Sequence, residues 1–193
     1  MRRIISLMHV SLDGVVQGPG SPDEDPSGGF EHGGWSREYR DESIGRQILQ
    51  MCSGELDLLL GRRTYEIWVD YWPKHDDNLI GRNFNAARKY VATNTLSELS
   101  WNNSEIVSRD LATRIREIKA MEGPEIHIWG SGELLQSLTA EGLVDEYRMF
   151  IYPVVLGQGK RMFEHGLPKS RLELASSEQG ESGMLFSTYR LEK

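Results

Sequence analysis

The sequence predicts an α/β fold in which helices cover both faces of a mixed, largely parallel sheet. First, short apolar segments alternate along the chain with segments whose apolar residues recur at helical spacing. Second, residues 126–155 contain a strand, a glycine-rich turn, a helix and a strand, a βαβ unit whose crossover implies parallel strands. Third, the β-rich segments 172–176 and 184–191, joined through Gly180 and Gly183, predict an antiparallel hairpin that closes the sheet.

The chain opens with a mostly apolar, β-branched segment over residues 4–12, which predicts a central strand buried on both faces. A helix is predicted over 41–52, because its apolar residues fall on one face and Asp41 or Glu42 places a negative charge in its first turn. Residues 56–60 predict a second buried strand, which leads directly into another helical segment.

The later elements continue this alternation. A helix over 83–89 precedes a short strand over 90–92, and Ile106 and Val107 indicate one more strand. Asp110 is the predicted cap of the next helix, which precedes the βαβ unit. The 193 residues fit one domain.

Residues 18–34 are rich in glycine, proline and acidic residues, and the segment is too long and too polar for an ordinary connection. We expect a mobile or functional loop within a single domain of residues 1–193. Phe30 and Trp35 lie in or beside this loop, either as anchors that pack it down or as walls of a pocket. The sequence favours neither alternative.

The composition restricts the classes of function. The formal net charge of −7 argues against a nucleic-acid-binding surface, and no apolar stretch approaches the roughly 20 residues of a membrane span. The single cysteine, Cys52, is expected to be a small buried residue and suits a reducing, cytoplasmic location. The histidines show no spacing typical of metal ligands, so no metal site is predicted; they are His9, His32, His75, His127 and His165.

Two short motifs suit an anionic ligand at the carboxyl ends of the strands, where open α/β sheets bind ligands. The first is the glycine-rich turn formed by Gly130, Ser131 and Gly132. It either exposes backbone N–H groups at a helix N-terminus, where a phosphate can bind, or is only a tight turn with Ser131 as the N-cap. Arg62 and Arg63 lie between a buried strand and a helix, where they either form bidentate bonds to a phosphate or make surface ion pairs of little energetic value.

Five segments follow one another in a set order over nearly the whole chain. They are SLDGVV at 11–16, LLLGRRTYEIW at 58–68, KYVATN at 89–94, IHIWGSGELLQSL at 126–138 and GLVDEYRMFIYPVVLGQGKRMF at 142–163. In this order they resemble the dihydrofolate reductase-like superfamily, most closely small proteins related to the C-terminal reductase domain of the bifunctional riboflavin-biosynthesis deaminase-reductase. The resemblance implies a three-layer αβα domain that binds NADPH across the carboxyl edge of its sheet.

The resemblance also implies which residues bind the cofactor. The motif that receives the adenosine phosphates matches Gly61, Arg62, Arg63 and Thr64, and the loop that flanks the 2′-phosphate matches Thr93 and Asn94. The turn and helix start beneath the pyrophosphate match Gly130, Ser131, Gly132, Glu133 and Leu134. The loop near the nicotinamide ribose matches Leu12, Asp13, Gly14 and Val15.

The implied function is an NADPH-dependent reductase that transfers hydride to a small heterocycle, a pyrimidine such as 5-amino-6-(5-phosphoribosylamino)uracil or a pterin such as dihydrofolate. The alternatives are a reductase of an unrelated carbonyl or quinone-like compound and a non-catalytic NADPH-binding regulatory protein. Substrate choice is expected to depend on the 18–34 loop, which matches neither the folate enzymes nor the riboflavin enzyme. Phe30 and Trp35 are the candidate substrate-binding residues there.

Reduction of a C=N or C=O bond also consumes a proton. The candidate donors are the carboxyl groups of Asp13, Asp41 and Glu42, or an ordered water. Each carboxyl group has an alternative role, because Asp13 suits a turn and Asp41 and Glu42 suit a helix start. Burial beneath the loop would raise the pKa of such a group and make it an acid near neutral pH.

The expected partners are a small-molecule substrate and a second copy of the chain. Small members of this superfamily often pair. Residues 147–155 are apolar on both faces, which is typical of a strand that closes a dimer interface.

Overall fold

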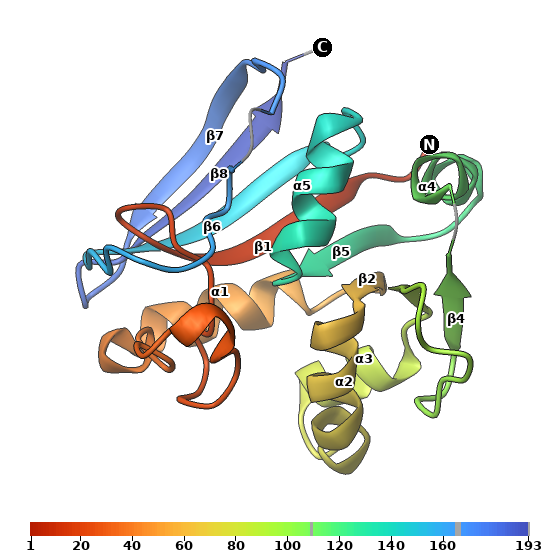
Figure 1. The fold of residues 1–193 in the computed structure, drawn as a ribbon, viewed down its shortest axis with the longest axis horizontal. Coiled ribbons are helices and arrows are strands. Elements are labelled where there is room, and N and C mark those ends of the chain that lie inside the picture. The colour runs from red at the N-terminus through yellow and green to blue at the C-terminus, as the bar shows by residue number, and fades with distance from the viewer. Residues whose placement is uncertain (109, 165–166, 193) are drawn as a thin grey trace.

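The computed structural model describes residues 1–108, 110–164 and 167–192. It contains an eight-stranded sheet in the order β4-β3-β2-β5-β1-β6-β8-β7 (Figure 1). The strands are β1 (Ile4–Ser11), β2 (Leu56–Gly61), β3 (Lys89–Ala92), β4 (Ser104–Val107), β5 (Glu125–Trp129), β6 (Glu146–Tyr152), β7 (Leu172–Gln179) and β8 (Leu185–Leu191). β1 to β6 run parallel, and β8 pairs antiparallel with β6 and with β7. The predicted mixed sheet with a C-terminal hairpin is therefore confirmed.

Helices cover both faces of this sheet and complete three layers. The α-helices of the described residues are α1 (Glu42–Met51), α2 (Arg62–Tyr71), α3 (Leu79–Ala86), α4 (Leu111–Ala120) and α5 (Gly132–Ala140). Buried side chains of α1, α2 and α3 join one core cluster, and those of α4 and α5 join another on the opposite face. None of the described helices is both long and apolar enough to cross a membrane.

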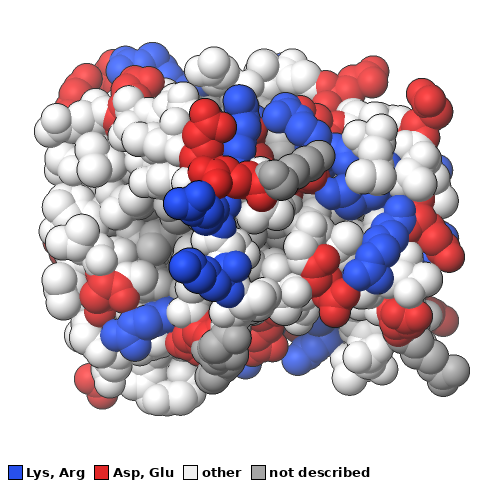
Figure 2. All heavy atoms as spheres, turned by 90° about the horizontal axis from the view of Figure 1, so that it is seen from above, with Lys and Arg blue, Asp and Glu red and all other residues white. Residues whose placement is uncertain are grey.

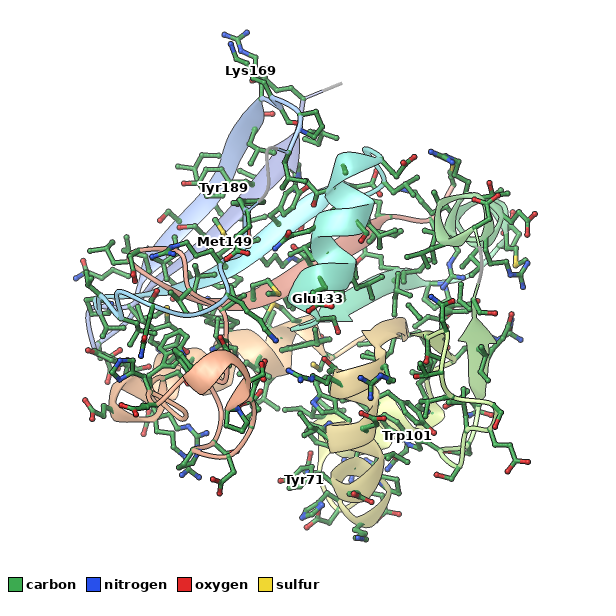
Figure 3. The ribbon with its side chains drawn as sticks, in the orientation of Figure 1. Tyr71, Trp101, Glu133, Met149, Lys169 and Tyr189 are labelled. Carbon is green, nitrogen blue, oxygen red and sulfur yellow. The ribbon has the colours of Figure 1, made fainter. Side chains whose placement is uncertain are left out.

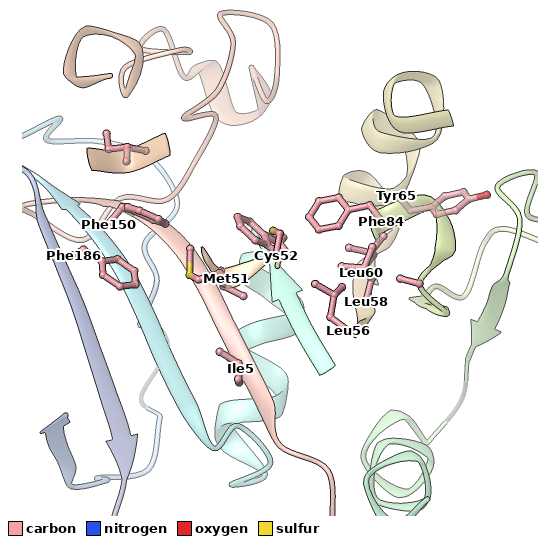
Figure 4. Close-up of a cluster of buried hydrophobic side chains, with 14 of the residues drawn as sticks. Ile5, Met51, Cys52, Leu56, Leu58, Leu60, Tyr65, Phe84, Phe150 and Phe186 are labelled. Atoms are coloured by element: carbon pink, nitrogen blue, oxygen red, sulfur yellow. The ribbon is translucent and has the colours of Figure 1, made fainter. Parts of the chain in front are cut away.

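The central strand β1 links the two clusters, because successive side chains of a strand point to opposite faces. Ile5 and Leu7 pack with the α1, α2 and α3 layer, whereas Ile4 and Met8 pack with α4 and α5. All four side chains are at most 1% exposed, which confirms the prediction of a strand buried on both faces. Figure 4 shows the first cluster, in which Cys52 is buried, as expected, and burial raises the pKa of its thiol to about 12.

One predicted helix is displaced along the chain. The helix expected over 83–89 is α3, which begins at Leu79 because the Asn78 side chain accepts a hydrogen bond from Gly81 N (3.0 Å). It ends before Lys89, which starts β3 and whose buried ammonium group donates to the carbonyl oxygens of Asn85 and Ala87, both at 2.9 Å. A capping side chain and a buried lysine thus set boundaries that apolar spacing did not indicate.

Ion pairs fix the amino edge of the sheet, opposite the edge where the parallel strands end. The buried guanidinium group of Arg2 pairs with Asp57 of β2 and donates from Nε to Pro124 O (2.6 Å), which joins the chain segments that enter β1, β2 and β5. Figure 2 shows basic and acidic side chains interspersed on one face, without a large patch of either sign.

The Arg2–Asp57 pair should contribute to the stability of the domain. We expect Asp57→Ala to lower the free energy of unfolding by about 3–5 kcal/mol, because it leaves a buried guanidinium group without its carboxylate. The matched control is Glu66→Ala, which removes the exposed partner of Arg62 and should cost no more than about 0.5 kcal/mol. Urea denaturation measures both variants, and equal losses would show that burial of the Arg2–Asp57 pair has no special weight.

Candidate active site

A cavity of about 1470 Å³ lies along the carboxyl edge of the parallel strands. Its lining includes residues at or just after the ends of β2, β3, β4 and β5, and His9 near the end of β1. The starts of α2 and α5, one side of α1, and the segments 16–20 and 160–161 complete the wall. Because β6 and β4 lie at opposite ends of the parallel part of the sheet, the cavity extends from Tyr152 to Thr95 and Asp110.

The glycine-rich turn does not form the simple N-cap that was one of the predicted alternatives. Gly130 and Ser131 both have a positive φ, of 56° and 57°, and the Ser131 side chain makes no capping bond to α5. Instead, Gly61 N donates to Ser131 Oγ (2.9 Å), and Ser131 Oγ donates to Thr64 Oγ1 (2.8 Å). Ser131 therefore occupies the predicted N-cap position of α5, but its hydroxyl group does not cap the helix and instead joins this turn to the start of α2.

The absence of a capping side chain matters for the N-terminus of α5. The first N–H groups of a helix have no acceptor within it, and here they belong to Gly132, Glu133 and Leu134, all of which line the cavity. Figure 3 shows Glu133 at the end of α5 that lies nearest the start of α2. The N-terminus of α2 also has no capping side chain and also lines the cavity. The cavity is thus bounded by two helix N-termini whose dipoles favour an anion.

The two arginines at the start of α2 line the cavity but have different partners. Arg62 pairs with Glu66 one turn later on α2, with Nη1 at 3.0 Å from the carboxylate. Arg63 instead pairs with Asp25 of the 18–34 loop and donates to Ser27 Oγ at 3.2 Å. Arg62 therefore makes the surface ion pair that was one of the two alternatives, whereas Arg63 holds a distant segment of the chain.

Asp25 fixes the 18–34 loop against the body of the protein. Its carboxylate also accepts from Lys160 Nζ (2.8 Å), so Asp25 bridges Arg63 and Lys160. Burial raises the pKa of Asp25, but hydrogen bonds from Lys160 and Ser27 outweigh burial and lower that pKa to about 2. Gln17 adds to the bridge, because its side chain donates to Asp25 O (2.9 Å) and accepts from Lys160 N (3.0 Å).

Phe30 and Trp35 anchor the loop and do not line the cavity, so their assignment as substrate-binding residues is corrected. Phe30 is 6% exposed and contacts Gly159, whose lack of a side chain leaves room for the ring. Trp35 is 8% exposed, donates from Nε1 to Gln17 O (2.8 Å), and packs edge-on against Tyr152. Both rings are used to bury the loop, which decides between the two alternatives left open by the sequence.

The residues after β1 that line the cavity lie further along the chain than the resemblance implied. Leu12 is 67% exposed, Gly14 forms a turn with φ of 87°, and Val15 is fully buried in the core, and none of the three lines the cavity. The reason is a tight reversal, in which Gly14 N donates to Ser11 O (2.9 Å) and turns this segment away. Val16, Gln17 and Gly18 line the cavity instead.

Asp13 and Asp41 are structural carboxylates. Asp13 lies outside the cavity lining and accepts from Leu156 N (3.1 Å) and Gly157 N (2.9 Å). Burial raises the pKa of Asp13, but these bonds and one from the Ser11 hydroxyl lower it to about 2. Asp41 lines the cavity as the N-cap of α1, and bonds from Ser43 and from the backbone of Ser182 hold its pKa well below the usual range.

The lowered pKa values of Asp13 and Asp41 determine whether these groups can act as the predicted acids. An ionised carboxylate has no proton to give near neutral pH, so the geometry does not favour Asp13 or Asp41 as a general acid. Glu42 is exposed and outside the cavity lining. None of the three predicted carboxyl groups is therefore placed to act as the acid.

Several residues that line the cavity were not predicted from the sequence. His9 and Tyr152 line the cavity as a hydrogen-bonded pair, and Arg40, Lys160 and Arg161 add positive charge to its wall. The only signal for His9 was a polar residue on an otherwise apolar strand face, and Tyr152 was indistinguishable from a core aromatic.

The remaining histidines do not suggest a metal centre. Among the residues that the structure describes, no group of three His, Cys, Asp or Glu side chains converges on one point. His127 is buried in β5, and its Nδ1 has no hydrogen-bond partner among the described residues. His165 lies outside the described residues.

Known proteins share both the sequence pattern and the fold. The family model described as the RibD C-terminal domain matches residues 2–186. Two uncharacterized proteins of Bacillus subtilis are similar over most of their length. YyaP is 26% identical over 197 residues, covering 97% of this chain and 94% of that protein, and YwjB is 25% identical over 183 residues, covering 92% of each.

Solved structures of low identity show the same fold. A putative riboflavin biosynthesis protein from Shewanella sp. PV-4 superposes with a TM-score of 0.70 at 19% identity, over 99% of both chains. A pyrimidine reductase-like protein from Corynebacterium diphtheriae gives a TM-score of 0.65 at 12% identity, over 100% of this chain and 92% of the other. Dihydrofolate reductase from Enterococcus faecalis, complexed with NADP(H) and RAB-propyl, gives 0.61 at 13% identity, over 99% and 97%.

The Asp25 bridge should hold the loop closed over the cavity. We expect Asp25→Asn to increase amide hydrogen exchange throughout residues 18–34, because the substitution removes the charge that Arg63 and Lys160 share. The control is Asp23→Asn, at an exposed carboxylate two residues away. Unchanged exchange in Asp25→Asn would show that Gln17 and the aromatic anchors hold the loop without the bridge.

The same bridge sets a pH dependence. Because the folded pKa of Asp25 lies below its unfolded value of about 3.9, its stabilising effect is present above about pH 4 and is lost as pH falls through about 2. Amide hydrogen exchange, measured by mass spectrometry on the folded domain, should therefore show that the 18–34 loop opens in the wild type only as the pH falls from about 4 to about 2.

Proposed function

The chain belongs to the RibD C-terminal domain family, and from this membership we propose that it is an NADPH-dependent reductase of a small heterocycle. The observation that carries the proposal is the cavity at the carboxyl edge of the sheet, bounded by two uncapped helix N-termini and basic side chains. Its volume of about 1470 Å³ exceeds the roughly 300–1,000 Å³ of a typical drug-sized pocket. It therefore has room for a dinucleotide and a second molecule.

The residues present fit a dinucleotide. A Cβ atom at Gly132 would meet only Val16 Cγ2, at 3.4 Å, so packing within the protein does not demand glycine there, and close approach of a ligand would. The N–H groups at the start of α5 would hold the pyrophosphate, and Arg62, Arg63 and Asn94 would hold the adenosine phosphates. When bound, NADPH would supply the hydride, while the protein supplies position and polarity.

The proposed substrate is a pyrimidine such as 5-amino-6-(5-phosphoribosylamino)uracil, or a pterin such as dihydrofolate. Support comes from the fold neighbours, among which are a pyrimidine reductase-like protein and a dihydrofolate reductase in complex with NADP(H). We place the substrate between α1 and the β1–β6 end of the cavity, because the anion-binding elements occupy the other end. The buried thiol of Cys52 suits the reducing cytoplasm, where we expect the protein to act.

The proposal predicts NADPH oxidation in the presence of one of these heterocycles. The decrease in absorbance of NADPH should depend on protein and on substrate, and it should be absent with the heterocycle alone. A protein that oxidises NADPH only with simple carbonyl or quinone compounds would contradict the substrate class. A protein that binds NADPH tightly and oxidises it with no compound of either class would be a regulatory binding protein.

The arginines should set the choice of cofactor. We expect Arg63→Ala and Arg62→Ala each to weaken NADPH binding roughly 10- to 100-fold, because a charge-assisted bond is worth about 1.5–3 kcal/mol, while NADH binding changes less. Fluorescence titration with both cofactors measures the preference. Arg46→Ala is the control, since Arg46 is exposed on α1 and outside the cavity lining. If the preference for NADPH is the same in all variants, the two arginines serve only as ion-pair partners.

We also propose that the chain forms a homodimer through the sheet beside α5. The strand register pairs Tyr147 with Tyr189, Tyr189 with Leu174, and Ile151 with Leu185, so these side chains share one face. Leu174 and Leu185 are 52% and 42% exposed, and Figure 3 shows Met149 and Tyr189 on the part of the sheet beside α5. Light scattering at micromolar concentration should give twice the 22.0 kDa of one chain, and a monomer would contradict the proposal.

A further inference from the structure

His9 and Tyr152 form a polar pair within an aromatic cluster at the β1–β6 end of the cavity. His9 Nδ1 lies 2.6 Å from the Tyr152 hydroxyl oxygen. The His9 ring stacks on Phe150 and Tyr152, with centroid distances of 5.0 Å and 5.6 Å. Trp35 and Tyr39 pack against the other parts of the Tyr152 ring, which is 1% exposed. These contacts hold the imidazole in one orientation.

The hydrogen bond to Tyr152 occupies one nitrogen of His9 and leaves the other. His9 Nε2 makes no hydrogen bond to any residue that the structure describes, and it is not among the buried side-chain atoms that lack a partner. It therefore retains access to solvent, and His9 lines the cavity. A ligand at this end of the cavity would meet a fixed polar atom beside the ring of Tyr152.

The surroundings keep this pair uncharged near neutral pH. Burial and, to a smaller extent, the positive charge of Arg40 lower the pKa of His9 to about 4. Burial raises the pKa of Tyr152, which keeps its hydroxyl group protonated. The ionised Asp41 lies nearby, and its carboxylate accepts from Ile44 N at the start of α1 and from Ser182 N in the β7–β8 turn. His9 is thus a neutral hydrogen-bonding group.

We propose that the Tyr152 hydroxyl group donates a hydrogen bond to His9 Nδ1 and so fixes His9 Nε2–H as the donor that binds the substrate. The phenol is the more acidic partner, so its O–H is the natural donor to an imidazole nitrogen. The acceptor would be the carbonyl oxygen or ring nitrogen that gains electron density as the adjacent carbon accepts a hydride. A preorganised donor at the position where charge develops stabilises that transition state.

This inference rests on the proposed function, and it explains how the reaction proceeds without a carboxylic acid. When bound, NADPH would supply the hydride to the substrate carbon, and water would supply the proton to the heteroatom of the C=N or C=O bond. His9 keeps its own proton throughout. The ligand class is therefore a compound with a C=N or C=O bond whose heteroatom can accept a hydrogen bond from His9 Nε2.

The first test measures the tautomer of His9 by NMR of protein labelled with ¹⁵N-histidine. At neutral pH we expect an unprotonated Nδ1 and a protonated Nε2 in the wild type. Tyr152→Phe keeps the ring but removes the hydroxyl group, so the two tautomers should mix in that variant. Tyr39→Phe, which removes a neighbouring hydroxyl group, is the control. A His9 protonated at Nδ1 in the wild type, or unaffected by Tyr152→Phe, would overturn the proposal.

The second test adds dihydrofolate or 5-amino-6-(5-phosphoribosylamino)uracil to the labelled protein saturated with NADP⁺, which cannot reduce either compound. Binding should shift the His9 Nε2 resonance and leave those of His32 and His75 in place, since neither lines the cavity. Calorimetry measures binding independently. Binding without a shift at His9 would overturn this inference alone, whereas binding of neither compound would overturn it together with the proposed substrate class.

The third test compares variants on the compound that is reduced. His9→Phe should lower kcat about 10²–10³-fold, as does loss of one preorganised donor, and should change KM only a few-fold. His9→Gln retains an amide donor near the position of Nε2 and should recover part of that loss. Equal defects in both variants, or a loss confined to KM, would show that His9 only packs the site.

Discussion

The hydroxyl group of Ser131 joins the two structural units on which the proposed cofactor site depends. It accepts from Gly61 N at the end of β2 and donates to Thr64 in the first turn of α2 (2.9 Å and 2.8 Å). Because Ser131 also precedes the first residue of α5, one side chain positions two helix N-termini beside the same cavity. Since the hydroxyl group is used in this way, the N–H groups of α5 stay available to an anion.

A second constraint is the position of the 18–34 loop against the cavity. The loop is held by the Asp25 bridge to Arg63 and Lys160 and by the buried rings of Phe30 and Trp35. The loop thereby brings Gln17 and Gly18 to the cavity wall, while its aromatic residues are withdrawn into the core. A ligand phosphate that binds Arg63 would compete with Asp25, so loop position and cofactor binding are expected to be coupled.

Periodicity and resemblance together predicted the order of the elements, the mixed sheet and the group of residues from Gly61 to Leu134 that line the cavity. They failed where a side chain had two plausible uses. In the sequence, an aromatic residue that anchors a loop cannot be told from one that lines a pocket. The contacts of Phe30 with Gly159 and of Trp35 with Tyr152 show that both are anchors. Asp13 is a carboxylate in a loop that suggested catalysis, yet hydrogen bonds from Ser11, Leu156, Gly157 and Arg161 make it structural. His9 and Tyr152 are separated by most of the chain, and only the parallel register of β1 and β6 brings them together.

The central claim is that the carboxyl-edge cavity binds NADPH and leaves room for a substrate. A crystal structure of the chain with NADPH tests it most directly. We predict electron density for the pyrophosphate at the start of α5, for the adenosine phosphates beside Arg62 and Arg63, and an empty space between the nicotinamide and His9. Density for the cofactor at another surface, or a cavity filled by the 18–34 loop when NADPH is present, would contradict the account.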